Sequence, residues 1–233
     1  MADYELIQAG RAVEATLGVV IPSFNAGAVS SVVDEIFEAA REAQMIVEVH
    51  VVDDGSVQPV TLGERDGLYL YRGVNQGKGA ALRFGLAQSK CGAVGFLDAD
   101  GDYDPRSLFA MASLIGEQRA DCVVGRRKVA GVGVRRVFSW LFRLWVCGWQ
   151  GIRVETQAGI KVFSRAVCER VLPSCVVNGF AFDVEILARA QRDGFTRVLE
   201  VPVEVRLVFA ETSVTPRHVL HALFDVARVG RCS

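Results

Sequence analysis

Short apolar runs alternate with longer amphipathic segments over residues 17–124, and this alternation constrains the fold more than any other feature of the sequence. Short runs rich in valine, isoleucine and leucine are typical of buried strands, whereas the segments between them have helical periodicity. The alternation predicts an α/β fold with a mostly parallel sheet flanked by helices. The predicted strands cover residues 17–21, 46–52, 68–71, 93–97 and 122–124, and the predicted helices cover 29–44, 78–89 and 105–117.

The pattern changes after residue 124. It predicts helices at 162–171, 182–192 and 216–229, the last of them amphipathic, and a strand at 198–207. Turn chemistry sets two boundaries: Pro22 is predicted to end the first strand, and Asp104 with Pro105 to begin a helix. Because 51% of the residues are hydrophobic and 23% are charged, the chain can bury a sizeable core, and we expect a single domain over residues 1–233.

Polar residues gather where the predicted strands end. Asn25 follows the first strand, Asp53 and Asp54 follow the second, residues 75–79 follow the third, and an aspartate-rich loop at 98–102 follows the fourth. In open α/β sheets, ligands bind beyond the carboxyl ends of the strands. Four loops that are far apart in the sequence are therefore expected to form one site at that edge.

The aspartate-rich loop carries Asp98, Asp100 and Asp102 at alternate positions. Carboxylate oxygens suit Mg²⁺ or Mn²⁺, which bind phosphates through one or two carboxylates and keep waters. On its own, such a loop is equally compatible with an acidic turn that caps the next helix. Lys78, at the start of a predicted helix, adds a cation and a helix N-terminus whose exposed N–H groups would suit a pyrophosphate.

Four segments in this order resemble the motifs of the family-2 inverting glycosyltransferases, which have a nucleotide-sugar-binding, Rossmann-like GT-A fold. They are Val20-Ile21-Pro22-Ser23-Phe24-Asn25, Val51-Val52-Asp53-Asp54-Gly55-Ser56, Asn75-Gln76-Gly77-Lys78-Gly79-Ala80-Ala81 and Leu97-Asp98-Ala99-Asp100. Downstream, residues 151–163 and 180–185 are similar to the branch that glycosylates polyprenyl phosphates, most of all to the dolichyl-phosphate β-glucosyltransferases. The resemblance covers residues 17–213.

The resemblance implies a metal-dependent transfer of a hexose with inversion. It implies a nucleotide-sugar-binding half, residues 17–124, and an acceptor- and membrane-facing half, residues 125–233, with C-terminal amphipathic helices. Asp53 and Asp54 would contact the nucleoside, and Lys78 would lie near the phosphates. The implied substrate-binding residues are Pro22, Asn25, Asp53, Asp54, Lys78, Asp98, Arg135, Arg136 and Lys161; the implied metal ligands are Asp98, Asp100 and Asp102; and the implied catalytic residues are Asp100, Arg126 and Glu155.

Arginines are the expected partners of the acceptor, because the guanidinium fork matches phosphate oxygens. Arg126 would meet the acceptor phosphate, with Arg135 or Arg136 as a second clamp. A lipid phosphate is already anionic at neutral pH, so it can attack the anomeric carbon without a strong general base. The branch usually has Asp where this chain has Glu155, and the longer side chain is a departure from the pattern.

A basic and aromatic segment, residues 134–149, contains three arginines and all 3 tryptophans of the chain. It predicts an in-plane interfacial helix on a membrane surface, and a core helix with solvated arginines is the alternative. The most apolar stretch, residues 137–152, is interrupted by Arg143 and is shorter than the roughly 20 residues of a membrane-spanning helix. Because the N-terminus lacks the features of a secretory signal, we expect a cytoplasmic protein that is attached peripherally to the cytoplasmic face of a membrane.

The charge and the cysteines exclude other classes. A formal net charge of −1 argues against a wholly basic nucleic-acid binder. The 6 cysteines form no C-x-x-C pair, which argues against a zinc site. The ligands that the resemblance implies are UDP-glucose or a similar nucleotide sugar, a polyprenyl phosphate, and Mg²⁺ or Mn²⁺. The open alternatives are a GDP-mannose donor, a non-lipid acceptor, a nucleotidyltransferase and a non-catalytic nucleotide-sugar-binding module.

Overall fold

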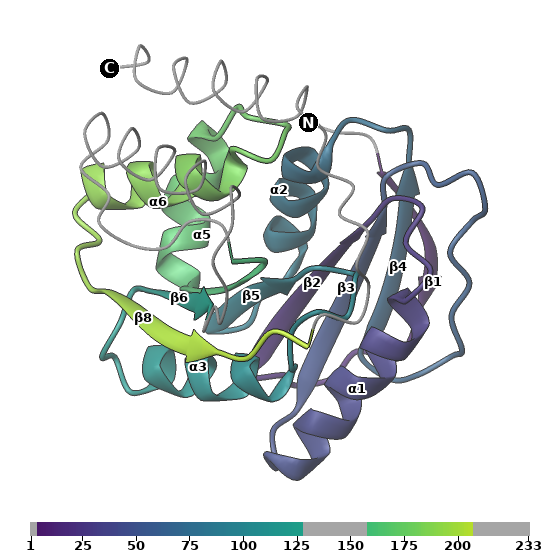
Figure 1. Cartoon of the computed structure of the whole chain (residues 1–233), viewed down its shortest axis with the longest axis horizontal. Helices are drawn as coiled ribbons and strands as arrows, with labels where there is room; N and C mark the ends of the chain where they lie inside the picture. The colour runs from purple at the N-terminus through teal and green to yellow at the C-terminus, as the bar shows by residue number, and fades with distance from the viewer. Residues whose placement is uncertain (1–3, 128–157, 207–233) are drawn as a thin grey trace.

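The computed structural model describes residues 4–127 and 158–206, which contain one eight-stranded sheet (Figure 1). The strands are β1 (Tyr4–Ala9), β2 (Leu17–Ser23), β3 (Val47–Asp53), β4 (Leu68–Gly73), β5 (Ala93–Leu97), β6 (Cys122–Arg127), β7 (Ile160–Ser164) and β8 (Val198–Val203). The helices are α1 (Val29–Glu42), α2 (Lys78–Gln88), α3 (Arg106–Gly116), α5 (Arg165–Val171) and α6 (Phe182–Arg192), with a 3₁₀ turn at Leu172–Ser174.

The strand order is β1-β4-β3-β2-β5-β7-β6-β8. Strands β4, β3, β2 and β5 are parallel to one another, and β6 is parallel to β8. Two strands run the other way: β1 joins β4 at the edge, and β7 lies between β5 and β6. The predicted α/β fold with a mostly parallel sheet is therefore confirmed, and the carboxyl ends of β2 to β6 lie at one edge beside the start of β7.

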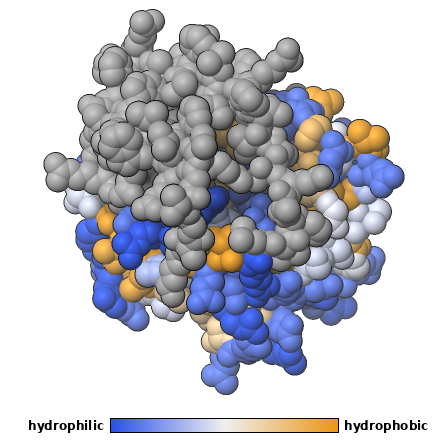
Figure 2. Space-filling model, viewed as in Figure 1, coloured by the Kyte–Doolittle hydropathy of each residue, from blue (hydrophilic) through white to orange (hydrophobic). Residues whose placement is uncertain are grey.

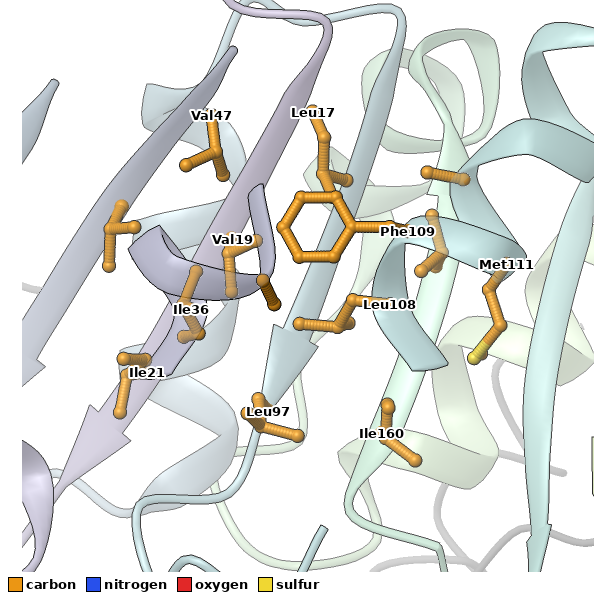
Figure 3. Close-up of a cluster of buried hydrophobic side chains, with 14 of the residues drawn as sticks. Leu17, Val19, Ile21, Ile36, Val47, Leu97, Leu108, Phe109, Met111 and Ile160 are labelled. Atoms are coloured by element: carbon orange, nitrogen blue, oxygen red, sulfur yellow. The ribbon is translucent and has the colours of Figure 1, made fainter. Parts of the chain in front are cut away.

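Helices cover both faces of the sheet (Figure 1). Along β2, alternate side chains point to opposite faces, as a pleated strand requires. Leu17, Val19 and Ile21 pack with Ile36 of α1 and Leu108 of α3 in one core cluster (Figure 3). The intervening side chains of the sheet pack in a second cluster with α2, α5 and α6. The two-sided burial explains why the central strands have continuous apolar sequences.

The helix predicted at 162–171 is wrong in its first turn. Residues 160–164 form β7, and α5 begins only at Arg165. Val162 and Phe163 are completely buried in the middle of the sheet, and a short apolar run has no periodicity that distinguishes a strand from a buried helix. Ser164 marks the boundary, because its side chain accepts a hydrogen bond from the N–H of Val167 and caps α5.

The first strand also ends later than predicted. Pro22 does not terminate β2, which continues to Ser23 while it pairs with β3. Pairing with β5 stops at Val20, so Pro22 lies where β2 has only one partner strand, a position that tolerates the missing N–H of proline. The edge strand β1 was not predicted, since most of its residues are exposed and only Tyr4 is buried.

Other boundaries differ from prediction by a few residues, and the strand predicted at 198–207 ends at Val203, with an isolated bridge between Val205 and Tyr103. The helices predicted at 134–149 and 216–229 lie outside the described residues. Within the described ranges, no helix has both the length and the apolar character needed to cross a membrane. The described surface seen in Figure 2 is mostly hydrophilic, with hydrophobic side chains in small groups.

Candidate active site

The loops after β2 and β3 are joined by side-chain hydrogen bonds. Ser56 Oγ accepts from the N–H of Asn25 at 2.8 Å, and Asn25 Oδ1 accepts from the N–H of Val57 at 2.9 Å. Asn25 has a φ of 53°, a left-handed conformation that asparagine adopts more readily than most residues. A cavity of about 580 Å³ opens between these loops and the start of α1, and residues from 25–30 and 56–61 line it.

Asp53 holds the loop that lines one side of this cavity. It is buried at the end of β3, and its Oδ1 accepts from the N–H of Ser56 at 2.9 Å while Oδ2 accepts from the N–H of Val60 at 3.3 Å. Arg72, at the end of β4, donates to the carbonyl of Ser56 at 3.0 Å and lies 3.7 Å from Asp53 Oδ2. The predicted nucleoside-contacting residue Asp53 therefore sets the conformation of the loop that borders the cavity.

Asp54 has a different set of partners. Its Oδ1 accepts from the hydroxyl of Tyr4 at 2.7 Å and from the N–H of Gln76 at 2.9 Å, and its Oδ2 accepts from the N–H of Gly77 at 2.8 Å. Only 3% of Asp54 is exposed. The carboxylate thus connects the loop after β3 to the loop that leads into α2.

The N-terminus of α2 is capped by the protein itself. The carbonyl of Asn178 accepts from the N–H groups of Gly79 at 2.7 Å and Ala80 at 3.3 Å. Gly77 has a φ of +100°, and a Cβ there would lie 2.5 Å from the same carbonyl, so only glycine fits. The prediction that this helix start exposes its N–H groups to a pyrophosphate is wrong for Gln76, Gly77, Gly79 and Ala80, because Asp54 and Asn178 engage them.

Glu185 holds the loop that carries Asn178. It is completely buried in the first turn of α6, where its carboxylate accepts from the N–H groups of Val176 at 3.0 Å and Val177 at 2.8 Å. Arg189, one turn later, donates to Glu185 Oε1 at 3.0 Å. A buried carboxylate with these donors is satisfied, so Glu185 serves the architecture around α2.

Lys78 reaches the aspartate-rich loop. Its Nζ lies 2.5 Å from Asp98 Oδ1, and both side chains are mostly buried. Burial by itself lowers the pKa of Lys78, but the carboxylates of Asp98 and Asp183 outweigh it and raise the pKa above the usual value. Lys78 is therefore a cation next to the first carboxylate of the loop.

A second buried ion pair joins Lys161 to Asp183. Lys161 on β7 donates to Asp183 Oδ2 at 3.0 Å and to the carbonyl of Ala158 at 2.6 Å. The ring of Phe96 lies near both lysines, with its centroid 5.9 Å from Lys78 Nζ and 5.2 Å from Lys161 Nζ. Burial lowers the pKa of Lys161, and Asp183 opposes this effect. Because Lys161 has no exposed surface, its place in this structure is in the support of the site, behind the surface that substrate would meet.

The three aspartates leave β5 together, but they do not converge. No group of three or more carboxylate, histidine or cysteine side chains in the described ranges is arranged to hold a metal ion. Asp102 Oδ1 is nevertheless buried without a hydrogen-bond partner in the described structure, which suits a cation. Desolvation by surrounding atoms, together with the charges of Asp98 and Asp102, raises the pKa of Asp100. A divalent cation held by one or two carboxylates and by phosphate oxygens fits this loop.

Gly159, just before β7, lets Asp98 take its position. A Cβ at residue 159 would lie 2.0 Å from Asp98 Oδ2. The N–H of Asp98 donates to the carbonyl of Gly159 at 2.9 Å, and the N–H of Gly159 donates to the hydroxyl of Tyr103 at 3.1 Å. Sequence reasoning did not single out Gly159, Tyr103, Tyr4 or Asn178. The only available signal was that Gly159 lies inside a motif segment.

The remaining predicted site residues are only partly described. Arg126 is exposed near the end of β6, at the same edge of the sheet as Asp98, and Pro22 is partly buried near the end of β2. Arg135, Arg136 and Glu155 lie outside the described residues.

Comparisons with known proteins agree with this architecture. A family model described as glycosyl transferase family 2 matches residues 18–165, more than half of the chain. The structure of glucosyl-3-phosphoglycerate synthase from Mycobacterium tuberculosis in complex with Mn²⁺, UDP-glucose and phosphoglyceric acid superposes with a TM-score of 0.70 at 17% sequence identity, covering 94% of this chain and 81% of that chain. This likeness confirms the GT-A fold.

Curated relatives are more similar in sequence. The dolichyl-phosphate beta-glucosyltransferase of Drosophila melanogaster is 30% identical over 75% of this chain and 62% of its own length, and the human protein of the same name is 28% identical over 75% and 63%. The chain thus spans less than two thirds of the length of these relatives. The chain belongs to glycosyl transferase family 2, and the resemblance seen in its motifs is confirmed.

Proposed function

We propose that this chain is a metal-dependent, inverting glycosyltransferase that moves glucose from UDP-glucose to a polyprenyl phosphate at the cytoplasmic face of a membrane. The observation that carries this proposal is the convergence of four loops at one sheet edge, where Lys78 contacts Asp98 of the aspartate-rich loop. Family membership supports the reaction class. The names of the relatives support the sugar and the acceptor.

The donor would lie across the carboxyl ends of β2, β3 and β5. The cavity bordered by Asn25 and Ser56 has room for a nucleoside, and Asp53 holds the loop that lines one side of it. Lys78 is a cation beside the loop that would receive the diphosphate. Asp98, Asp100 and Asp102 would hold Mg²⁺ or Mn²⁺, which would neutralise charge on the leaving nucleoside diphosphate.

The acceptor would approach from the side of β6. Arg126 is exposed there and can pair with phosphate oxygens, and we assign Arg135, Arg136 and Glu155 to the same half of the site on their sequence alone. An anionic phosphate oxygen can attack the anomeric carbon in line without a strong base, which inverts the configuration. The interfacial helix at 134–149 remains our proposal for contact with the membrane surface.

The test is release of nucleoside diphosphate by the purified protein. UDP- and GDP-sugars are supplied with Mg²⁺ or Mn²⁺, with and without a short-chain polyprenyl phosphate. We expect release from UDP-glucose that depends on both lipid and metal. If the lipid-dependent release came from GDP-mannose instead, the donor would be GDP-mannose and not UDP-glucose. Turnover that does not depend on the lipid would contradict the assignment of a polyprenyl phosphate as acceptor.

A pair of variants tests the metal assignment. Asp100→Asn should abolish turnover while the protein stays folded. Asp104→Asn is the matched control: Asp104 lies in the same stretch of chain, but its carboxylate accepts from the N–H of Arg106 at 3.0 Å, at the start of α3, so turnover should persist. Full activity of Asp100→Asn would contradict the assignment of Asp100 as a metal ligand.

A further inference from the structure

Tyr4 lies outside the segment that matches the family, which begins at residue 18. It is the first residue of the edge strand β1, where it pairs with Gly73 at the carboxyl end of β4. The antiparallel addition of β1 to the sheet therefore brings Tyr4 to the edge at which the candidate site is formed. Its ring is buried against Phe84 of α2, with centroids 4.9 Å apart.

The hydroxyl of Tyr4 points at a carboxylate of the site. It donates to Asp54 Oδ1 at 2.7 Å, and the same carboxylate accepts from the N–H groups of Gln76 and Gly77. Burial and the neighbouring Asp54 raise the pKa of Tyr4 well above its usual value, so the phenol keeps its proton and remains a donor. Tyr4 is thus one of three donors that hold the buried carboxylate in one orientation.

The orientation of Asp54 matters for the residue that follows Gly77. Asp54 anchors the two peptide N–H groups immediately before Lys78, and Lys78 Nζ contacts Asp98. Loss of the Tyr4 hydroxyl would leave a buried carboxylate oxygen short of a donor, which favours a different rotamer or an added water. Either change would shift the loop at 75–77 and, with it, Lys78.

We propose that Tyr4 is a positioning residue for the donor site: its hydroxyl fixes Asp54, which in turn places the start of α2 and Lys78 for the nucleotide diphosphate. This inference rests on the proposed function for its ligand. The inference gives a role to β1, a strand that lies outside the residues matched by the family model.

The test compares Tyr4→Phe with the wild type. The variant keeps the buried ring and removes only the hydroxyl. We expect the dissociation constant for UDP in the presence of Mn²⁺, measured by calorimetry, and the KM for UDP-glucose each to rise about three- to tenfold, the range for loss of one hydrogen bond. The kcat at saturating donor should stay within about twofold, because the reacting atoms are not touched.

Tyr71→Phe is the matched control. Tyr71 is buried in the same core cluster, 5.1 Å from Phe84, but its hydroxyl lies 3.3 Å from His50 Nδ1 and does not contact Asp54. It should lose stability without a change in UDP affinity. An unchanged dissociation constant for Tyr4→Phe would overturn the proposal, and so would an equal rise in both variants, since that would reflect a general weakening of the core.

Hydrogen exchange separates this inference from the proposed function. If the wild type binds no UDP, the proposed function fails, yet the amides of Gln76 and Gly77 still report on Asp54. Tyr4→Phe should speed exchange at these two amides relative to Tyr71→Phe. Identical exchange in the two variants would overturn the positioning role whatever the ligand.

Discussion

At the residue scale, several charged side chains of the candidate site are buried and are bound by other groups of the protein. Asp53, Asp54 and Lys161 were all predicted to bind substrate, yet each is buried and hydrogen-bonded to the protein. A motif records that a residue type is required at a position. It does not record whether the carboxylate or ammonium group meets a ligand or a backbone group of another loop, because that depends on contacts between distant segments.

The buried pair of Lys161 and Asp183 leads to a stability prediction. Lys161→Met removes the cation and leaves Asp183, whose side chain is only 10% exposed, without its partner. Breaking a buried pair on one side costs about 3–5 kcal/mol of unfolding free energy, which urea denaturation measures. Glu42→Gln, in the exposed pair with Arg106, should cost far less, because solvent screens an exposed ion pair. Similar losses in the two variants would contradict the prediction.

Glu48 leads to a prediction about pH. Burial favours its neutral form, but two neighbours outweigh burial and hold the pKa of Glu48 at about 2: His50, whose Nε2 lies 3.3 Å from Glu48 Oε1, and Ser89, whose hydroxyl donates to Oε1 at 2.6 Å. Because this value is below the unfolded value of about 4.3, the stabilisation is complete above pH 4.3 and is lost as the pH falls towards 2. Glu48→Gln should therefore be less stable than the wild type by about 2 kcal/mol at pH 6, with a smaller difference at pH 3.

Urea unfolding at several pH values measures this difference. The exposed Glu64 provides the control, since Glu64→Gln should give a curve parallel to that of the wild type. A stability gap for Glu48→Gln that does not narrow at low pH would show that the carboxylate is not the source of the effect.

At the scale of secondary structure, the sequence pattern predicted most of the helices and central strands. It missed the two strands whose formation depends on pairing with other strands. The strand at Ala93–Leu97 and the helix at Phe182–Arg192 have the predicted bounds. In contrast, β7 was predicted as helix because its apolar run is short, and β1 was missed because only one face of an edge strand needs apolar residues. Pairing between strands, which is invisible in local sequence, determines both.

Replacing two helical glycines with alanine is expected to change the stability of the protein in opposite directions. Alanine is normally favoured over glycine in a helix by about 1 kcal/mol. At Gly79 in the first turn of α2, however, a Cβ would lie 2.7 Å from the carbonyls of both Val177 and Gly179, so Gly79→Ala should destabilise the protein by about 1–3 kcal/mol. At Gly116, which ends α3, nothing lies within 4 Å of a Cβ, and Gly116→Ala should be neutral or stabilising. Thermal unfolding of both variants decides the matter, and a stabilising Gly79→Ala would disprove the close contact between α2 and the loop at 175–181.

At the scale of the whole molecule, the two halves expected from the resemblance, residues 17–124 and 125–233, share one sheet. Strand β6 crosses the boundary between the halves, β7 from the second half lies between β5 and β6, and β8 lies on the other side of β6. The second half also supplies the carbonyl of Asn178 that caps α2. The sequence order of the strands gave no sign of this insertion, since a strand can pair with a distant segment without any local signature.

This arrangement predicts that residues 17–124, the first of these halves, do not fold alone. In a fragment of residues 1–124, the remaining part of β6 would have neither of its neighbours, because both β7 and β8 lie beyond the cut. Strand β5 would expose its unpaired edge, and the start of α2 would lose its cap. Unpaired backbone groups and uncovered apolar surface are each unfavourable, so the fragment should show no cooperative urea transition by circular dichroism, whereas the full chain should show one. A fragment that unfolds cooperatively and binds UDP with the affinity of the full chain would mean that the first half forms its site without the inserted strand.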